Sequence, residues 1–237
     1  MHIVAWNIRW GGQDRVERIA QTFRDYSPDV IVLSEYQPKG SASLLAALAE
    51  QGFVHQAVTS PPERKGGVAI VSRHQLSPIA LPTSLVPFNW RYLPVSVPEL
   101  SIEIIGLYGP LQKEPYDAFW EAALDALETA SLRSTLVVGD FNTGESLVDT
   151  PVADFFCSRF FSSLSTRGYT DLWRQMAGRE AREYSWLGTV NPFRLDHAFG
   201  TQSVVSRLRS CSYSHAERLS GASDHSLLSV ELADATA

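Results

Sequence analysis

Short, nearly continuous runs of apolar residues recur along the chain. They are too short for helices and too uniformly apolar for strands with one face in water, so they predict β-strands buried on both faces. The clearest runs span residues 2–6, 30–34, 67–71, 102–108 and 134–139. Further strand-like runs, broken by Pro and Gly, occupy residues 76–107 and 195–232.

Helical periodicity occurs between these runs. Apolar residues recur every three or four positions over 14–26, 41–51 and 115–131, which predicts three helices with one buried face each. Pro115 is acceptable in the first turn of the third helix. Because no repeat or linker divides residues 1–237, the pattern favours one α/β domain of packed sheets with outer helices.

The composition is that of an ordinary globular protein. Of 237 residues, 44% are hydrophobic, which is enough to offset chain entropy and excludes disorder. Two cysteines exclude a disulfide framework and a four-cysteine zinc site. The longest stretch without a formal charge, 74–90, contains three prolines and cannot be a membrane span. No secretory signal is visible, and we expect a cytoplasmic monomer.

The net charge limits how the chain could bind a polyanion. Lys and Arg number 20 against 26 Asp and Glu, for a formal charge of -6, which argues against indiscriminate nucleic-acid binding. Nucleic acid is still an allowed partner. The carboxylates of an active site would themselves contribute negative charge, and a bound divalent cation would reverse the local field.

Polar residues follow the buried strands at the points where the strands end. Asn7, Glu35, Tyr108 and Asp140 each come at the carboxyl end of an apolar run, with Asn142 two residues further on. If these strands lie side by side, their ends meet at one rim, where open sheet proteins bind ligands.

Three more polar residues lie in the carboxyl-terminal part of the chain. Asp196 lies inside one apolar run, and Asp224 with His225 precedes another. Singly, such residues are more often turn or cap residues. As a set of four carboxylates, two amides, a phenol and an imidazole, they are costly to bury without a metal or a substrate.

Six short motifs occur in a fixed order: WN (6–7), LSE (33–35), LYGP (107–110), GDFN (139–142), RLDH (194–197) and SDH (223–225). In these motifs the chain resembles the endonuclease/exonuclease/phosphatase superfamily, which includes nucleases, inositol phosphatases and sphingomyelinases. The resemblance implies a DNase I-like fold, a four-layer α/β sandwich of two mixed β-sheets packed face to face with outer helices. It also implies a divalent-metal-dependent phosphoester hydrolase.

The resemblance assigns the metal to Glu35, Asn7 and Asp224. Glu35 would be the principal ligand of Mg²⁺ or Mn²⁺, which prefer hard oxygen ligands and bind substrate phosphate directly. Asn7 would lie beside it, and Asp224 would complete the acidic cluster, where it could hold a second metal.

The resemblance also assigns catalytic roles. Asp140 would orient or deprotonate the attacking water, and Asn142 would donate to a phosphate oxygen or position that water. His225, oriented by Asp196, would donate to the scissile phosphate, as could the phenol of Tyr108. Water would attack phosphorus in line, without a covalent intermediate.

Substrate contacts are expected from residues near the strand ends. Arg9, Trp10 and Trp186 could clamp a phosphate or stack on a base, and Arg194, with Arg73, could contact further phosphates. Trp6, Trp120 and Trp173 are expected in the core. His197 could contact substrate, but a position facing away on the same strand is favoured. The Gly-, Pro- and Ser-rich segments 61–67, 143–150 and 188–193 are candidate specificity loops.

Three functions are compatible with these residues. The favoured one is a nuclease-like phosphodiesterase acting on DNA or RNA, because the Tyr108 motif and the compact length resemble the nuclease branch. An enzyme for lipid or inositol phosphates is the alternative, although neither an apolar hairpin nor a Lys/Arg cluster is plain in the sequence. The third is an inactive binding module on the same fold. Signatures of serine hydrolases, P-loop enzymes and zincins are missing.

Overall fold

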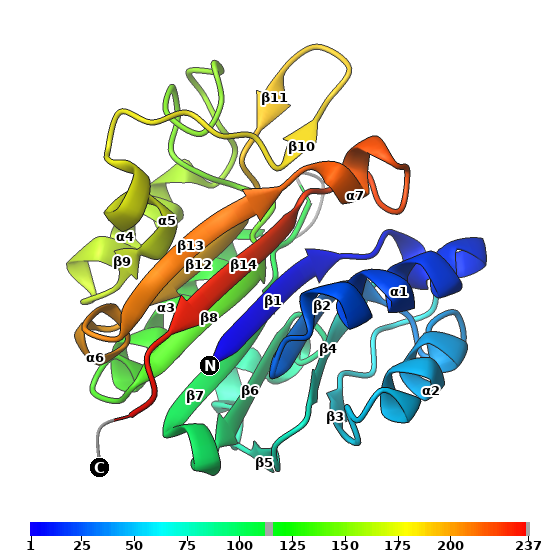
Figure 1. Ribbon diagram of the computed structural model, residues 1–237. Helices are drawn as coiled ribbons and strands as arrows, with labels where there is room; N and C mark the ends of the chain where they lie inside the picture. Colours follow the sequence, from blue (N-terminus) through cyan, green and yellow to red (C-terminus); the bar gives the residue numbers. More distant parts are fainter. Residues whose placement is uncertain (112–115, 236–237) are drawn as a thin grey trace.

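The computed structural model describes residues 1–111 and 116–235. Two mixed six-stranded β-sheets pack face to face, and helices cover the outer face of each sheet (Figure 1). The predicted four-layer α/β sandwich is therefore confirmed.

The first sheet has the strand order β13-β14-β1-β2-β4-β3. Within it β1 and β2 run parallel and the other neighbours antiparallel. Its strands are β1 (His2–Asn7), β2 (Val30–Tyr36), β3 (His55–Val58), β4 (Gly67–Ser72), β13 (Leu208–Ser214) and β14 (Leu227–Leu232).

The second sheet has the order β5-β6-β7-β8-β12-β9, in which β7 and β8 run parallel. Its strands are β5 (Ser77–Pro78), β6 (Tyr92–Val97), β7 (Ile102–Tyr108), β8 (Thr135–Asp140), β9 (Thr170–Asp171) and β12 (Asp196–Gly200). Two further short strands, β10 (Trp186–Leu187) and β11 (Pro192–Phe193), form a separate hairpin.

The helices are α1 (Val16–Tyr26), α2 (Ala42–Glu50), α3 (Tyr116–Ala130), α4 (Ser158–Thr166), α5 (Leu172–Ala177), α6 (Gln202–Val205) and α7 (Ala216–Leu219), with 3-10 helices η1 (Trp10–Arg15), η2 (Thr83–Phe88) and η3 (Pro98–Leu100). The three predicted helices correspond to α1, α2 and α3, and Pro115 lies outside the described residues. The first begins at Val16 rather than at residue 14, because residues 14 and 15 belong to η1, which Gly11, Gly12 and Gln13 interrupt with positive φ angles. None of the described helices is long and apolar enough to cross a membrane.

Alternate residues of the central strands face different layers. Val30 and Val32 of β2 lie in the core between the two sheets, whereas Ile31 and Leu33 pack against α1 and α2. A third core joins the second sheet to α3 and α4. A strand covered on both faces needs apolar residues at every position, which explains the continuous runs.

The aromatic residues predicted to be core are buried. Trp6, Trp120 and Trp173 are at most 7% exposed. His197 has no exposed surface; its Nε2 lies 2.9 Å from the Thr143 carbonyl oxygen, which accepts a hydrogen bond from it. The prediction that His197 faces away from the strand-end residues is confirmed.

Burial lowers the pKa of His197 from 6.5 to about 4. The unfolded chain therefore binds a proton between these pH values that the folded chain rejects. Stability contributed by the neutral ring is complete above pH 6.5 and is lost as the pH falls toward 4, by roughly 3 kcal/mol in total. We expect the free energy of unfolding, measured by urea denaturation, to fall less between pH 7 and pH 4.5 in His197→Gln than in the wild type. An equal decrease in both proteins would contradict the lowered pKa of His197.

Candidate active site

The predicted site residues meet at one edge of the sandwich. β1 and β2 end there in the first sheet, and β7 and β8 end there in the second. Asn7, at the end of β1, donates from Nδ2 to Asp140 Oδ2 at 2.8 Å and to Glu35 Oε1 at 3.2 Å. Asn7 thus joins the two sheets at this edge, and three predicted residues lie in direct contact.

Glu35 occupies an irregular position at the end of β2. The register with β4 shifts between Ser34 and Tyr36, and Glu35 has a φ of 60°. Such a bulge re-aims a side chain. The carboxylate accepts a hydrogen bond from the backbone N of Trp10 at 2.8 Å, and the Tyr108 hydroxyl lies 3.5 Å from Oε1.

The loop 61–67 lies directly against Glu35. A Cβ on Gly66 would lie 2.8 Å from the Cα of Glu35, so a side chain at position 66 would push this loop away. The loop therefore helps to define the space around the carboxylate, as expected of a loop that contributes to the site.

Asp140 is buried at the interface between the sheets, with 1% of its surface exposed. Besides Asn7, the backbone N of Asn142 donates to its Oδ1 at 2.9 Å. Burial raises the pKa of Asp140 to about 7, and the nearby Asp196 carboxylate adds to the shift. A carboxylate that exchanges a proton near neutral pH has the properties of a general base.

Asp196 and His225 form a buried pair. His225 Nδ1 lies 2.8 Å from Asp196 Oδ2. Burial disfavours the charged imidazole, but the Asp196 and Asp140 carboxylates outweigh it and raise the pKa of His225 to about 10. The ring is therefore protonated at neutral pH and donates from Nδ1 to Asp196, which leaves the Nε2 proton for another acceptor.

Hydrogen bonds between side chains and backbone groups hold the loop of the SDH motif, residues 223–225, against β1. Ser223 donates from Oγ to the Asn7 carbonyl at 2.6 Å and accepts from the His225 backbone N at 3.3 Å. The Trp6 indole donates to the His225 carbonyl at 3.0 Å. These bonds set the position of His225 relative to Asn7.

A cavity of about 460 Å³ opens beside these residues. Glu35, Asn142, Asp224 and His225 form one part of its wall. The rest is apolar or aromatic, apart from Asp154, and comprises Leu111, Val152, Phe155, Phe156, Trp186, Phe193 and Leu195. Charged and apolar walls thus lie next to each other, so the cavity could take a ligand with a charged and an apolar part.

The acidic side chains suit a hard divalent cation, but in different ways. Asp140, Asp196 and His225 place ligand atoms within 4.8 Å of one another. There the protonated His225 already pairs with Asp196 and offsets one of the two carboxylates, which disfavours a second cation. Glu35 faces the cavity and offers carboxylate oxygens beside Asn7, and Asp224 lines the same cavity. The donor set predicted from the sequence therefore fits Mg²⁺ or Mn²⁺ better than the buried cluster does.

Three of the predicted substrate-contacting residues lie beside this cavity. Arg9 and Trp10 are exposed next to Glu35, and the backbone N of Arg9 donates to Asn7 Oδ1 at 2.9 Å. Trp186 lines the cavity, and its Nε1 lies 3.4 Å from Asp224 Oδ2.

The prediction for Arg194 is wrong. Arg194 has no exposed surface, and it donates from Nε to Asp149 at 2.7 Å and from Nη2 to Asp171 at 2.5 Å. Two buried carboxylates already occupy the guanidinium, so it cannot contact a substrate. Arg73 is also excluded, because it follows Ser72 of β4, which pairs with Val30 at the opposite end of β2 from Glu35.

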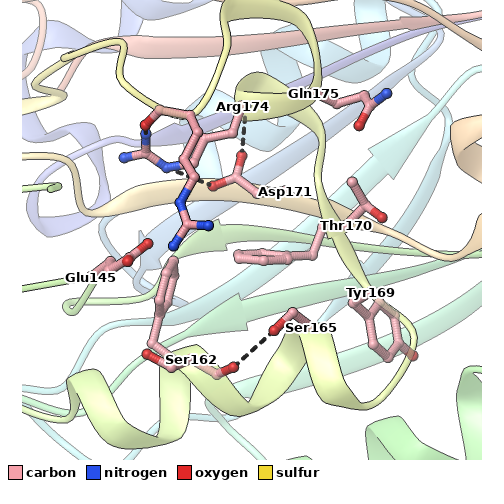
Figure 2. Close-up of a pocket in the computed structure, with 11 residues that line it drawn as sticks. Glu145, Ser162, Ser165, Tyr169, Thr170, Asp171, Arg174 and Gln175 are labelled. Carbon is pink, nitrogen blue, oxygen red and sulfur yellow. Dashed lines mark hydrogen bonds and ion pairs between the residues drawn. The ribbon is translucent and has the colours of Figure 1, made fainter.

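A second, larger cavity of about 540 Å³ lies next to this ion-pair network. Figure 2 shows residues that line it. Its charged lining residues are Glu145, Asp171, Arg174 and Arg179, of which Asp171 and Arg174 bond to each other. It contains none of the predicted catalytic residues. The smaller cavity is therefore the candidate active site.

Sequence reasoning found Trp186 but missed the rest of the apolar wall of the site. Phe155 and Phe156 lie in the long connection between β8 and α4, and no strand end or motif marks them. The one signal available was two adjacent phenylalanines in a segment without helical or strand periodicity. Large apolar side chains in a loop are stabilised by packing against other parts of the protein.

These residues form a metal-compatible, carboxylate-rich pocket beside a protonated imidazole, which is typical of enzymes that hydrolyse phosphate esters. The model of the Endonuclease/Exonuclease/phosphatase family matches residues 4–225, and the chain belongs to this family. It is thus a phosphoester hydrolase by class. No curated protein matches the chain significantly in sequence.

Solved structures of low identity share the fold. The 3′ phosphatase NExo from Neisseria, bound to a product DNA hairpin, superposes with a TM-score of 0.82 at 22% identity, covering 98% of this chain and 99% of that one. The 3′–5′ exonuclease NExo from Neisseria meningitidis gives 0.81 at 22%, covering 98% and 100%. An AP endonuclease from Archaeoglobus fulgidus gives 0.82 at 17%, covering 98% and 99%.

The Asp196–His225 pair predicts a measurable titration. In the metal-free protein, the NMR signals of the His225 ring should show a protonated imidazole at pH 8. Asp196→Asn should lower the pKa of His225 by removing the closest carboxylate. A ring that titrates near pH 6.5 in the wild type would contradict the pairing.

Proposed function

We propose that the protein is a divalent-metal-dependent phosphodiesterase that acts on nucleic acid and prefers terminal, damaged or flexible positions to intact duplex. The single observation that carries the proposal is the aromatic cavity beside His225, Asn142 and Glu35. Its relatives by fold include enzymes named for action on DNA, which supports the same substrate class.

The two halves of the cavity suit the two parts of a nucleotide. A phosphate would lie beside His225, whose protonated ring can donate to it, and beside Glu35, where a bound divalent cation would supply further positive charge. The attached sugar or base would lie against the aromatic wall, which includes Trp186, Phe155 and Phe193. Bases and sugars of an intact duplex are stacked and cannot enter such a pocket, whereas unpaired or terminal ones can.

The side chains support in-line attack by water. Asp140 would accept a proton from the water, and Asn142 would orient it. His225 would donate from Nε2 to a phosphate oxygen as negative charge accumulates, and the Tyr108 hydroxyl could donate on the other side. A divalent cation held by Glu35, Asn7 and Asp224 would neutralise the phosphate oxygens as a Lewis acid.

A second candidate rests on the β10–β11 hairpin. Its Leu187 is 54% exposed and its Val190 is 86% exposed, beside the cavity wall formed by Trp186 and Phe193. The sequence did not show an apolar hairpin plainly, but the structure places exposed apolar side chains on one. A lipid phosphodiester, with its headgroup in the cavity and the hairpin against the membrane surface, is therefore the alternative substrate class.

An inactive binding module is the remaining alternative. The acidic residues, both asparagines and the histidine of the six motifs are present and lie at one edge of the sandwich. Calorimetric titration with Mg²⁺ or Mn²⁺ distinguishes this alternative, because a scaffold without a metal site would bind neither cation.

The assignment of the metal to Glu35 predicts that Glu35→Gln loses most turnover while the fold is retained. The amide keeps the side-chain volume but removes the negative charge that holds the cation. Rates at saturating Mg²⁺ and Mn²⁺, with the apparent metal affinity, provide the measurement. Glu99→Gln is the matched control, because Glu99 is exposed and pairs with His74, away from the described site. Near-wild-type metal affinity in Glu35→Gln would overturn the assignment.

A hydrolysis panel tests the substrate class. It should contain abasic duplex, single-stranded DNA, RNA, 3′-phosphorylated DNA, sphingomyelin and inositol phosphates, each with Mg²⁺ or Mn²⁺. We expect turnover of unpaired, terminal or damaged nucleic acid. Turnover of a lipid or inositol phosphate with none of the nucleic acids would move the enzyme to the alternative class.

The charge distribution predicts a shallow salt dependence in the same assays. With a net charge of -6, the protein can make few phosphate contacts outside the site. Because Arg194 and Arg73 are excluded, we expect one or two contacts, with Arg9 the leading candidate. Each contributes a slope of about -0.9 in log affinity against log salt on duplex DNA. A slope steeper than about -4 would show an extended binding surface and contradict this expectation.

A further inference from the structure

Arg91 lies directly before β6 and belongs to none of the sequence motifs. Its carbonyl accepts a hydrogen bond from Tyr108 N at 2.8 Å, which extends the β6–β7 pairing to the last residue of β7. The side chain is 3% exposed. Its Cζ lies 3.8 Å from the centroid of the Trp90 ring and 5.2 Å from that of Tyr108. The guanidinium is thus packed against aromatic rings immediately behind the active-site edge.

The guanidinium binds the backbone where β7 ends. Arg91 Nη1 donates to the carbonyl oxygens of Tyr108 at 3.0 Å and of Gly109 at 2.7 Å. Hydrogen bonds from a charged donor are stronger than those between neutral groups. Arg91 therefore restrains the orientation of these two peptide groups.

Gly109 is the junction between Arg91 and the GDFN loop. Its backbone N donates to the Asp140 carbonyl at 2.7 Å. A Cβ at this position would lie 1.9 Å from the Phe141 carbonyl oxygen, so no larger residue fits. The Gly109 carbonyl also accepts a hydrogen bond from Asn142 Nδ2 at 3.0 Å. Arg91 and Asn142 thus occupy both lone pairs of one carbonyl oxygen.

This contact determines which atom Asn142 presents to the cavity. A carbonyl oxygen only accepts, so the amide group facing Gly109 must be the NH₂ group, and Oδ1 points the other way. Asn142 lines the cavity with Glu35 and His225, and its backbone N is bonded to Asp140. Asn142 therefore offers an acceptor beside the Asp140 carboxylate, and two acceptors can hold the two protons of one water with its lone pair turned outward.

We infer that Arg91 is a positioning residue for hydrolysis, because through the Gly109 carbonyl it fixes the Asn142 amide with Oδ1 toward the attacking water. Loss of the guanidinium frees the Gly109 peptide and allows the Asn142 amide to rotate and present NH₂ instead. The inference rests on the proposed function for the identity of the water, but the hydrogen-bond relay itself does not depend on the substrate.

Arg91→Met and Arg91→Lys test the relay by kinetics, with bis(4-nitrophenyl) phosphate and the best substrate of the panel. Misplacement of a reacting group by about 1 Å costs on the order of 10²-fold in rate. We expect Arg91→Met to lower kcat by about that factor with KM changed less than about threefold, since no substrate contact is removed. Arg91→Lys should recover part of the loss, because the ammonium can reach one carbonyl.

Arg207→Met is the matched control. Arg207 also donates to backbone carbonyls, at 3.1 Å to Leu100 and 2.9 Å to Ala233, but it lies at the opposite end of the sheets. A general cost of removing such an arginine would appear in both variants. We expect Arg207→Met to melt at a lower temperature than the wild type with kcat unchanged.

Two results would overturn the inference. The first is a folded Arg91→Met variant with kcat within threefold of the wild type, or an equal loss in Arg207→Met. The second is additivity with Asn142→Ala. If Arg91 acts through Asn142, adding Arg91→Met to Asn142→Ala should lower kcat by less than about threefold more, because residues that act as a unit are non-additive.

NMR of the Asn142 side-chain amide tests the relay without turnover. In the wild type, these protons should be protected from solvent exchange, and protection should fall at least tenfold in Arg91→Lys or Arg91→Met. Unchanged protection would overturn the inference even if the protein were inactive on every substrate. If protection of the Asn142 amide changes as expected but the protein hydrolyses no phosphodiester, the proposed function is contradicted and the positioning role of Arg91 is not.

Discussion

The buried carboxylate of Asp140 is the constraint on which the active-site edge depends. Removal of a carboxylate from water costs several kcal/mol unless donors replace the lost hydration. Asn7 supplies one donor from the opposite sheet, the Asn142 backbone supplies another, and the protonated His225 supplies positive charge nearby. Because these donors come from separate strands and loops, the carboxylate is satisfied only where the two sheets meet.

The same requirement explains the unusual backbone around the site. Arg9, Trp10, Glu35 and Asn142 all have positive φ angles, which non-glycine residues adopt only at an energetic cost. In return, the backbone N–H groups of Arg9, Trp10 and Asn142 each reach a side-chain oxygen of the site. Further from the edge, Arg194 ties Asp149 in the 143–150 loop to Asp171, which anchors the start of the connection that carries Phe155 and Phe156.

Local sequence pattern was sufficient for an α/β domain of packed sheets and for the polar residues at the strand ends, whereas the four-layer sandwich was implied by the resemblance of the six motifs to a known family. β2 reads as a continuous apolar run because Val30 and Val32 face one layer and Ile31 and Leu33 face the other. Polar residues at the strand ends could be found in the same way, since a polar side chain that terminates a buried strand is conspicuous. The identity of the chemical groups at the edge, and hence the class of reaction, was therefore determined by the sequence.

Tertiary structure decided how those groups are used. Arg194 lies in the RLDH motif and Arg9 lies close to the WN motif. Arg194 is paired with Asp149 and Asp171, whereas Arg9 is exposed beside Glu35. Arg91 carries no local signal, and Phe155 and Phe156 carry only that of an aromatic pair outside a periodic segment, because their neighbours in space come from distant parts of the chain. The start of α1 and the protonation of His225 likewise depend on backbone geometry and on charges brought close by folding. Sequence sets the chemical groups and their periodicity, whereas pairing, burial and charge compensation arise only when the two sheets pack.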